Sequence, residues 1–474
     1  MPRRISGLGI CSALLLALAC GGDDGSGPAS TGVRIVSGDA QTDTIQGAAH
    51  EIVIEVRRRG RPGVGLAVRF ERIPSENPGG PFDTILGVAP SRESFGAFVV
   101  DTTDGDGRAS TLVIPGTVAG QGHVVVTCAE VGAADTATYT ILPGNVARVV
   151  LDVKDTAIHV GGSYRVTGFP EDRLRNRRQD ALAFSAGPNA ASVSSDGTIV
   201  VGGTVGPGAV AVRAGTALDS ARFLVVPAAN IVFYHATARS IATSALDGSN
   251  LHILVAATTT AFPVASPTSD LVVYHQTDGL YIVDGTGARR RLLDPSVVQS
   301  ALHPRFSADG RFVYFGARGG ADHAPYVWRV GIDGTGLQQQ GGGPHYYLDE
   351  GQVAPSPSGD RIAYVDGSSL VLEYLSTGKV VTLAVLGYFP VFSPDGSRLA
   401  YLADQSVYVA NPDGSAPVRL ANQMVTFDAG LTWLAGGRWL VTKSGANVLL
   451  VDATSGATFS LPGLADYSQI AGRP

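Results

Sequence analysis

Residues 390–401 read PVFSPDGSRLAY, and residues 353–364 read VAPSPSGDRIAY. In both stretches an apolar run leads into a Ser-Pro-x-Gly turn, and a second apolar run follows and ends in tyrosine. Proline, aspartate and glycine supply the backbone angles of tight turns, so each stretch predicts two strands joined by a hairpin turn. A unit of this kind that recurs at a fixed interval indicates an architecture assembled from equivalent pieces.

Weaker copies of this unit extend the repeat over the C-terminal half of the chain. They lead to four further positions that we take as equivalent: Tyr234, Tyr274, Tyr314 and Thr442. With the two clear copies this gives six units, most of them about 40 residues apart, a length that suits four short strands and their turns. The first unit lacks an inner strand. We expect residues 467–471 to supply it, because this exchange closes a ring and removes two exposed strand edges.

The recurring turn resembles the signature of the TolB-like propeller family, over residues 228–474. The resemblance implies a six-bladed β-propeller built from WD40-like repeats. Propellers of this kind also precede serine hydrolase domains in relatives of prolyl oligopeptidase. We find no Gly-x-Ser-x-Gly motif and no phosphate-binding Gly-rich loop, so the sequence predicts no catalytic residue and no cofactor.

Residues 32–143 and 144–227 predict two smaller β domains, because short runs such as IVIEV at 52–56 alternate apolar and polar residues. The stretch RPGVGLAVRF at 61–70, with TDGDGRAST at 103–111, resembles bacterial Ig-like domains of the invasin and intimin type. The stretch ASVSSDGTI at 191–199, followed by GPGAVAVRA, resembles the group 2 bacterial Ig-like domain. The predicted fold class is all-β: two Ig-like β-sandwiches followed by the propeller.

The first residues predict export. Arg3 and Arg4 precede an apolar run over residues 5–19, which is the plan of a secretory signal peptide. Residues 17–20 read ALAC and resemble the lipobox of bacterial lipoproteins. The resemblance implies removal of residues 1–19, acylation of Cys20, a flexible tether over residues 20–31 and an outer-membrane lipoprotein that faces the periplasm or the cell surface. A plain signal peptide that releases a soluble protein is the alternative.

The bulk composition supports large cores without disulfides. Of 474 residues, 44% are hydrophobic and 16% charged, which excludes wholesale disorder. The net charge of −6 gives no basic footprint for nucleic acid. We expect the arginine clusters at 173–178 and 289–291 to lie in solvated loops. Once the signal and Cys20 are set aside, only Cys128 remains, and its apolar strand predicts a buried small hydrophobe.

One rim of the propeller is the predicted binding surface. The segment around residues 317–325 enlarges one hairpin, and such hairpins share a face with the loops that lead into the inner strands. Aromatic and acidic side chains therefore converge there, and the candidate binding rim comprises Asp322, His323, Tyr346, Tyr347, Asp349, Glu350, Tyr388 and Asp428.

Two further hypotheses concern metal ions. Asp101, Asp104 and Asp106 offer carboxylates on one turn, as calcium prefers, but the acidic residue that completes a calcium loop is missing. His235 and His275 follow repeat tyrosines in neighbouring units, and repeat equivalence explains them without a metal.

The function predicted from these features is that of a non-catalytic binding or scaffolding lipoprotein, monomeric and anchored to the membrane by its lipid. Its propeller face would dock a protein or a glycan of the cell envelope. The alternatives are a carbohydrate-active propeller enzyme, either a lyase or a hydrolase, and a cell-surface adhesin.

Overall fold

The computed structural model of the protein describes residues 30–73, 85–87, 95–152, 155–256, 262–294, 296–319, 324–342, 352–367, 369–385, 387–420 and 430–473. Every regular secondary-structure element assigned in these ranges is a β-strand, which confirms the all-β prediction. The described residues include no helix long and apolar enough to cross a membrane. Contacts divide the chain into two compact units: residues 1–147 with 171–179, and residues 148–170 with 180–474. The predicted boundaries at 143 and 227 remain predictions, and Cys20 lies outside the described residues.

The first unit contains two sheets that share one core. One sheet is formed by β1 (Gly32–Ser37), β3 (His50–Arg58), β4 (Arg61–Pro62), β6 (Ile85–Gly87), β7 (Phe95–Gly96) and β9 (Arg108–Ile114). The other is formed by β2 (Gln41–Thr44), β5 (Ala67–Ile73), β8 (Phe98–Thr102), β10 (Gly120–Cys128) and β11 (Ala133–Leu142). Side chains from both sheets, such as Ile54 and Phe70, make a common buried cluster. Cys128 lies in that cluster as a buried free thiol, as predicted.

A second group of strands follows along the chain in three small sheets. Their members are β12 (Val146–Leu151) with β15 (Gly168–Asp172); β13 (Thr156–His159), β16 (Ala183–Ala186), β19 (Gly206–Ala214) and β20 (Ala217–Val226); and β14 (Ser163–Arg165), β17 (Ala190–Val193) and β18 (Thr198–Val201).

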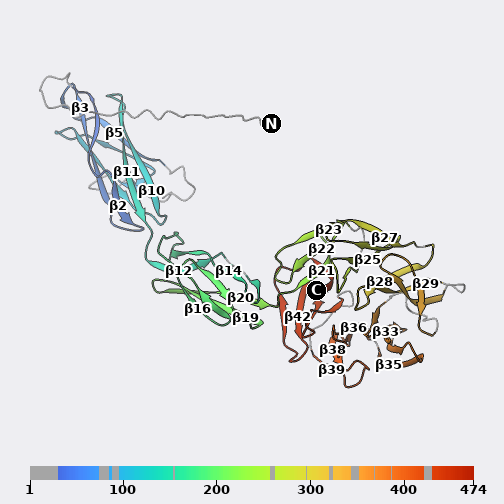
Figure 1. The fold of residues 1–474 in the computed structure, drawn as a ribbon. Helices are drawn as coiled ribbons and strands as arrows, with labels where there is room; N and C mark the ends of the chain where they lie inside the picture. The colour runs from blue at the N-terminus through green and yellow to red at the C-terminus, as the bar shows by residue number, and fades with distance from the viewer. Residues whose placement is uncertain are drawn as a thin grey trace, which may run out of the picture. The chain divides into compact units, whose positions relative to one another are not determined.

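The remaining strands form six four-stranded antiparallel sheets among the described residues, which we call blades 1 to 6 (Figure 1). Each is given from its inner strand outward. Blades 1 to 3 are β44 (Tyr467–Arg473), β21 (Asn230–His235), β22 (Ser240–Ala245), β23 (His252–Ala256); β24 (Val264–Ala265), β25 (Val272–Gln276), β26 (Gly279–Val283), β27 (Arg289–Leu293); and β28 (Gln299–Phe306), β29 (Phe312–Gly319), β30 (Ala324–Gly331), β31 (Gln338–Gln340).

Blades 4 to 6 are built in the same way. They are β32 (Val353–Pro355), β33 (Arg361–Asp366), β34 (Ser369–Tyr374), β35 (Lys379–Val385); β36 (Tyr388–Phe392), β37 (Leu399–Ala403), β38 (Ser406–Ala410), β39 (Val418–Arg419); and β40 (Leu431–Trp433), β41 (Trp439–Ser444), β42 (Asn447–Asp452), β43 (Thr458–Leu461).

The six inner strands form a closed circle, in which β24, β28, β32, β36, β40 and β44 each contact the next and β44 contacts β24. This is the arrangement of a β-propeller. The circle closes inside blade 1, where β44 pairs with β21 although the two strands lie at opposite ends of the ring sequence. Residues 467–471 were predicted to supply the inner strand of the first repeat, which is blade 1, and this prediction is confirmed.

The Ser-x-Asp-Gly turns also form as predicted. In blade 5 the hydroxyl of Ser393 donates to Asp395 over 2.5 Å, and the backbone N–H of Ser397 donates to the same carboxylate. Gly396 has a φ of +71°, a backbone conformation that side-chain-bearing residues rarely adopt. Local turn chemistry therefore fixes the corner between the inner strand and the second strand.

Strand pairing corrects the predicted repeat register in two blades. In blades 2, 4, 5 and 6 an inner-strand residue pairs with the residue just before the predicted position, as Val391 does with Ala400. In blade 3, Arg305 pairs with Tyr314 itself, and in blade 1, Ala471 pairs with Val232. The equivalent residues are therefore Phe315 and Phe233. This buried position holds tyrosine or phenylalanine in five blades and Thr442 in blade 6, so tyrosine alone was a misleading marker.

The arginine cluster at 173–178 lies outside the strands, as predicted, whereas the cluster at 289–291 does not. Residues 289–291 belong to strand β27, where Arg291 pairs with Asp278 at 2.9 Å and lies over the ring of Tyr281. In the other cluster, Arg178 donates to the carbonyls of Pro143 and Gly144, so the segment is tied to the backbone of its own unit. These cations hold structure, and the loop prediction was wrong for residues 289–291.

Candidate binding site on the axis of the ring

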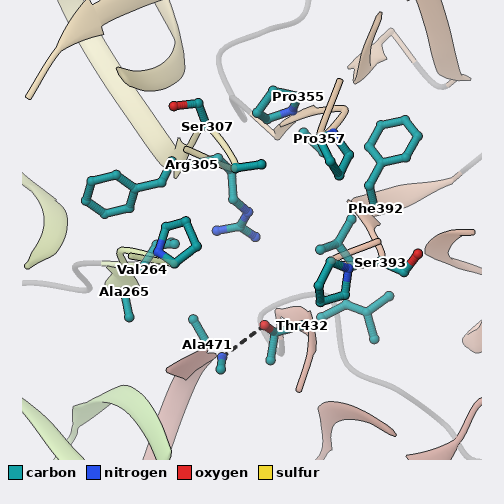
Figure 2. Close-up of a pocket in the computed structure, with 18 residues that line it drawn as sticks. Val264, Ala265, Arg305, Ser307, Pro355, Pro357, Phe392, Ser393, Thr432 and Ala471 are labelled. Atoms are coloured by element: carbon teal, nitrogen blue, oxygen red, sulfur yellow. Dashed lines mark hydrogen bonds between the residues drawn. The ribbon is translucent and has the colours of Figure 1, made fainter. Parts of the chain in front are cut away.

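A cavity of about 220 Å³ lies where the six inner strands meet (Figure 2). Every inner strand contributes two residues to its wall: Val264 and Ala265, Arg305 and Phe306, Ala354 and Pro355, Val391 and Phe392, Leu431 and Thr432, and Ala471 and Gly472. The turns that follow add Pro267, Ser307, Ala308, Pro357, Ser393 and Pro394. The wall is mostly apolar, and it lies at the C-terminal ends of the inner strands.

One circle of equivalent positions forms the innermost part of this wall. In blades 2 to 6 the residue that opens the turn donates its backbone N–H to the carbonyl five residues later. Two residues before that donor stand Val264, Arg305, Ala354, Val391 and Thr432, and in blade 1 Ala471 lines the same wall. Five of the six are small and uncharged. Arg305 is the exception, and Figure 2 shows its guanidinium group pointing into the middle of the cavity.

Arg305 has no acidic partner among the described residues. Its one hydrogen bond runs from Nη1 to the carbonyl of the adjacent Pro304 at 3.4 Å, which is long for a protein hydrogen bond. The side chain is half-buried, and loss of solvent lowers the pKa of Arg305 to about 10. That value still leaves the guanidinium protonated at neutral pH. The cavity therefore contains one positive charge.

The hydroxyl groups of the wall are already engaged. Ser307 Oγ donates to Asp309 over 2.6 Å, and Ser393 Oγ donates to Asp395. Thr432 Oγ1 accepts the backbone N–H of Gly472 over 2.9 Å and lies 3.3 Å from the Trp433 carbonyl. Donation by the serine hydroxyls also lowers the pKa of Asp395 to about 2. The guanidinium of Arg305 is therefore the main polar group offered to a ligand.

A second layer lies two residues earlier on the inner strands. Phe262, His303, Phe389 and Gln469 there all have positive φ values, between +39° and +53°. Strand pairing shifts register near the last three, as a β-bulge does. Glutamine side chains accept two of the freed backbone donors: Gln469 from Phe262 at 2.9 Å, and Gln352 from Phe389 at 2.6 Å. We call this level of the ring the collar: it carries aromatic and amide groups, of which His303, Phe389 and Gln469 are buried.

His275 is packed behind this collar, against the ring of Phe262 at 5.5 Å between centroids. Burial lowers the pKa of His275 to about 4, because the charged imidazolium would lose its solvent. Its ring centre lies 6.4 Å from that of His303. His235 is not its equivalent, since the corrected register of blade 1 places Tyr234 at that position. The proposed equivalence of the two histidines was wrong by one residue.

The predicted rim lies almost entirely outside the described residues: Asp322, His323, Tyr346, Tyr347, Asp349, Glu350 and Asp428. Tyr388 is the described member. It begins strand β36 and packs against the buried cluster that contains Phe389. The rim stays a prediction. It was predicted in loops that lead into the N-terminal ends of the inner strands, whereas the cavity lies at the C-terminal ends of these strands.

Sequence reasoning missed Arg305, although a signal was available. Four turns open with serine, and aligning these repeats on that serine places Arg305 in a column with Val264, Ala354 and Val391. A charge in such a column departs from the pattern of its own repeat, which is a stronger signal than a cluster of polar residues in loops.

The calcium candidates form a turn instead. One oxygen of Asp104 accepts the backbone N–H groups of Asp106 and Arg108, each over 2.9 Å, and Asp101 accepts that of Ser110. In the part of the chain that the structure describes, no group of three or more histidine, cysteine or acidic side chains is placed to hold a metal ion.

No family and no curated protein matches the sequence. Solved structures resemble the fold. A protein assigned as TolB from Agrobacterium tumefaciens is 14% identical, with a TM-score of 0.38, over 49% of this chain and 87% of that one. An oligogalacturonate lyase from Vibrio parahaemolyticus is 11% identical, with a TM-score of 0.28, over 59% and 72%. The Escherichia coli adhesin FdeC is 15% identical, with a TM-score of 0.32, over 75% and 96%. At these values the similarity carries no argument about function.

Proposed function

We propose that the protein is a non-catalytic binding module of the bacterial cell envelope. In this proposal Cys20 carries the lipid anchor, the two N-terminal β domains are Ig-like spacers, and the six-bladed, TolB-like propeller takes a protein or glycan partner. One observation supports the binding role most directly: the inner strands of all six blades line a single cavity. A group that enters it contacts every blade at once, so the ring presents it with a preformed, rigid site.

The wall suits a compact apolar group. Prolines from three turns and phenylalanines from two inner strands surround the cavity, and proline walls lose little conformational freedom when they are covered. Binding energy in such a site is not spent on ordering the protein. The partner is therefore expected to insert one side chain, chain end or sugar into the axis.

Site-specific crosslinking in the native host tests this role. A photoreactive amino acid replaces Thr432 in the cavity wall, and a second chain carries it at Tyr388 to sample the predicted rim. The control replaces Val418, an outer-strand residue whose surface is 57% exposed. We expect a discrete adduct from Thr432 and none from Val418. Equal adducts from Thr432 and the control Val418 would overturn the binding role. The absence of an adduct from both Thr432 and Tyr388 would also overturn it.

The anchor needs a separate test. Metabolic labelling with a fatty-acid analogue should label the wild-type chain and not the Cys20→Ser chain. The variant should also leave the membrane fraction. Unchanged labelling of Cys20→Ser would refute acylation at this position. Cleavage of an acidic glycan by the purified protein would favour the alternative of a carbohydrate-active enzyme.

A further inference from the structure

The strongest unassigned feature of the ring is the uncompensated cation on its axis. Two other arginines of the ring have acceptors or aromatic cover. Arg438 pairs with Asp452 at 2.8 Å, and Arg398 donates to the carbonyls of Gly437 and Ala453 above the ring of Trp433. Among the described residues, Arg305 has only the long contact to its neighbouring carbonyl. A half-buried charge without a partner is costly, so its position calls for an explanation beyond packing.

Packing alone would favour a small residue at this position. The five equivalent residues are Val264, Ala354, Val391, Thr432 and Ala471, and each fits the same wall. Replacement of an unpaired buried charge by an apolar side chain of similar volume is often stabilising. Arg305 therefore does not serve the ring in the unliganded state.

The wall also limits which anion can bind. The serine and threonine hydroxyls are committed to Asp309, Asp395 and the backbone, so one guanidinium supplies the charge and the donors. A guanidinium presents parallel N–H groups that match the two oxygens of a carboxylate. A phosphate dianion has more charge and more acceptors than this single group satisfies. The surrounding prolines favour an uncharged body behind the anionic group.

We propose that Arg305 anchors a carboxylate-binding site on the axis of the ring, which accepts one carboxylate carried by a compact, otherwise uncharged group. This rests on the proposed function in that the carboxylate is the part of the partner that enters the cavity. A peptide C-terminus and an acidic sugar both present this chemistry. The two sources differ in the body behind the carboxylate, which meets the proline wall.

Calorimetric titration of the purified full chain tests the site directly. The probes are N-acetyl-alanine for a peptide terminus, glucuronate for an acidic sugar, N-acetyl-alanine amide as the uncharged match, and inorganic phosphate. We expect a Kd on the order of 1 mM for at least one carboxylate, and affinity at least tenfold weaker for the amide and for phosphate. The tighter of the two carboxylates identifies the source. Phosphate binding as tightly as the carboxylates would overturn the assignment.

Two variants connect the binding to this residue. Arg305→Met should abolish carboxylate binding, and Arg305→Lys should weaken it at least tenfold because the ammonium lacks the planar fork. The matched control is Arg311→Gln, which removes an exposed arginine from the turn that follows β28 and should bind like the wild type. Binding that survives in Arg305→Met would refute the site.

Thermal unfolding separates a binding role from a structural one. Because the charge lacks a partner, Arg305→Met should unfold at the same temperature as the wild type or higher. A clear fall in the unfolding temperature would show that Arg305 supports the ring, and would overturn the proposal.

The result is also distinguishable from failure of the proposed function. If the Thr432 adduct persists in the Arg305→Met chain and no carboxylate binds to the wild type, the binding function stands. The cavity then recognises a group other than a carboxylate. Carboxylate binding through Arg305 without any adduct would keep the site and remove the macromolecular partner.

Discussion

The strands of the first unit and those of the ring are buried in different ways. In β10 buried residues alternate with more exposed ones, so one face meets the core and the other meets solvent. In β37 all five residues are buried, and β22 is buried at its first five positions. The cause is architectural, since a blade packs against a neighbour on each face. A strand of the ring therefore has no solvent-facing side on which polar residues are free.

This difference sets the rule for polar groups in the ring. Thr442 is buried and donates to the Gly430 carbonyl over 2.9 Å, and buried Glu373 accepts from the hydroxyl of Tyr364 over 3.1 Å. In the first unit the corresponding groups, such as Arg34 and Arg57 beside Glu55, reach solvent. Arg305 departs from this pattern, because its charge has no acidic partner among the described residues.

The largest effect should come from emptying the two cores. Phe70→Ala in the first unit and Phe315→Ala in the ring each remove a fully buried ring, which costs about 3–5 kcal/mol. All three tryptophans, Trp328, Trp433 and Trp439, belong to the ring, so tryptophan fluorescence follows that part alone. In denaturant, Phe315→Ala should shift the fluorescence transition, and Phe70→Ala should shift only a transition seen by circular dichroism. Equal shifts in fluorescence would show that the two cores unfold together.

Acid should weaken the ring through His275. Its pKa is about 4 when folded and 6.5 when exposed, so the unfolded chain binds more protons between these values. Stability is therefore complete above pH 6.5 and falls as the pH drops toward 4. The loss from this group is about 2–3 kcal/mol at pH 4.5. The free energy of unfolding should be measured in denaturant at pH 7.5 and at pH 4.5. The difference between the two pH values should be smaller in His275→Gln than in the wild type by this amount.

The control for this prediction is His252→Gln, which changes an exposed histidine of the same ring. It should keep the acid sensitivity of the wild type. Identical behaviour of the two variants would mean that burial of His275 does not govern the response.

The smallest effects should come from the turns, where the two regions use the same chemistry. Asp104 in the first unit and Asp395 in the ring both accept backbone N–H groups within their turns. Each Asp→Ala change should cost about 1 kcal/mol, because exposed donors regain water. Thermal scans should also show no stabilisation by millimolar calcium, since Oδ1 of Asp104 already accepts two backbone N–H groups. A calcium-dependent shift lost in Asp104→Ala would restore the metal hypothesis.

The sequence predicted what local chemistry determines. The Ser-x-Asp-Gly corners and the exchange of residues 467–471 into the first blade follow from turn residues and from repeat counting. It misplaced Tyr234 and Tyr314, because a buried slot selects aromatic volume and the neighbouring Phe233 and Phe315 fill it equally well. Register of this kind depends on pairing across strands, which a single repeat letter does not encode.

The site was harder to predict for a related reason. Arg305 is separated along the chain from the wall residues of the other blades, and closure of the ring brings them together. The prediction favoured clusters of polar residues close in sequence, and most of those fall outside the described residues. Equivalent positions of the repeats meet around the cavity. A comparison of the repeats position by position can therefore identify wall residues that are far apart in the sequence.

Closure of the ring also determines when the folding chain becomes able to bind a ligand in the cavity. Blades 2 to 6 are each formed from consecutive strands, but blade 1 waits for a partner far downstream: the hydroxyl of Ser468 meets the carbonyl of Tyr234 across 234 residues. Contacts this distant form late in folding. Until β44 is added, the cavity lacks the wall made by Ala471 and Gly472. Ligand affinity would therefore report that a chain has been synthesised through β44 and has folded, so a chain interrupted before β44 could not compete for the partner.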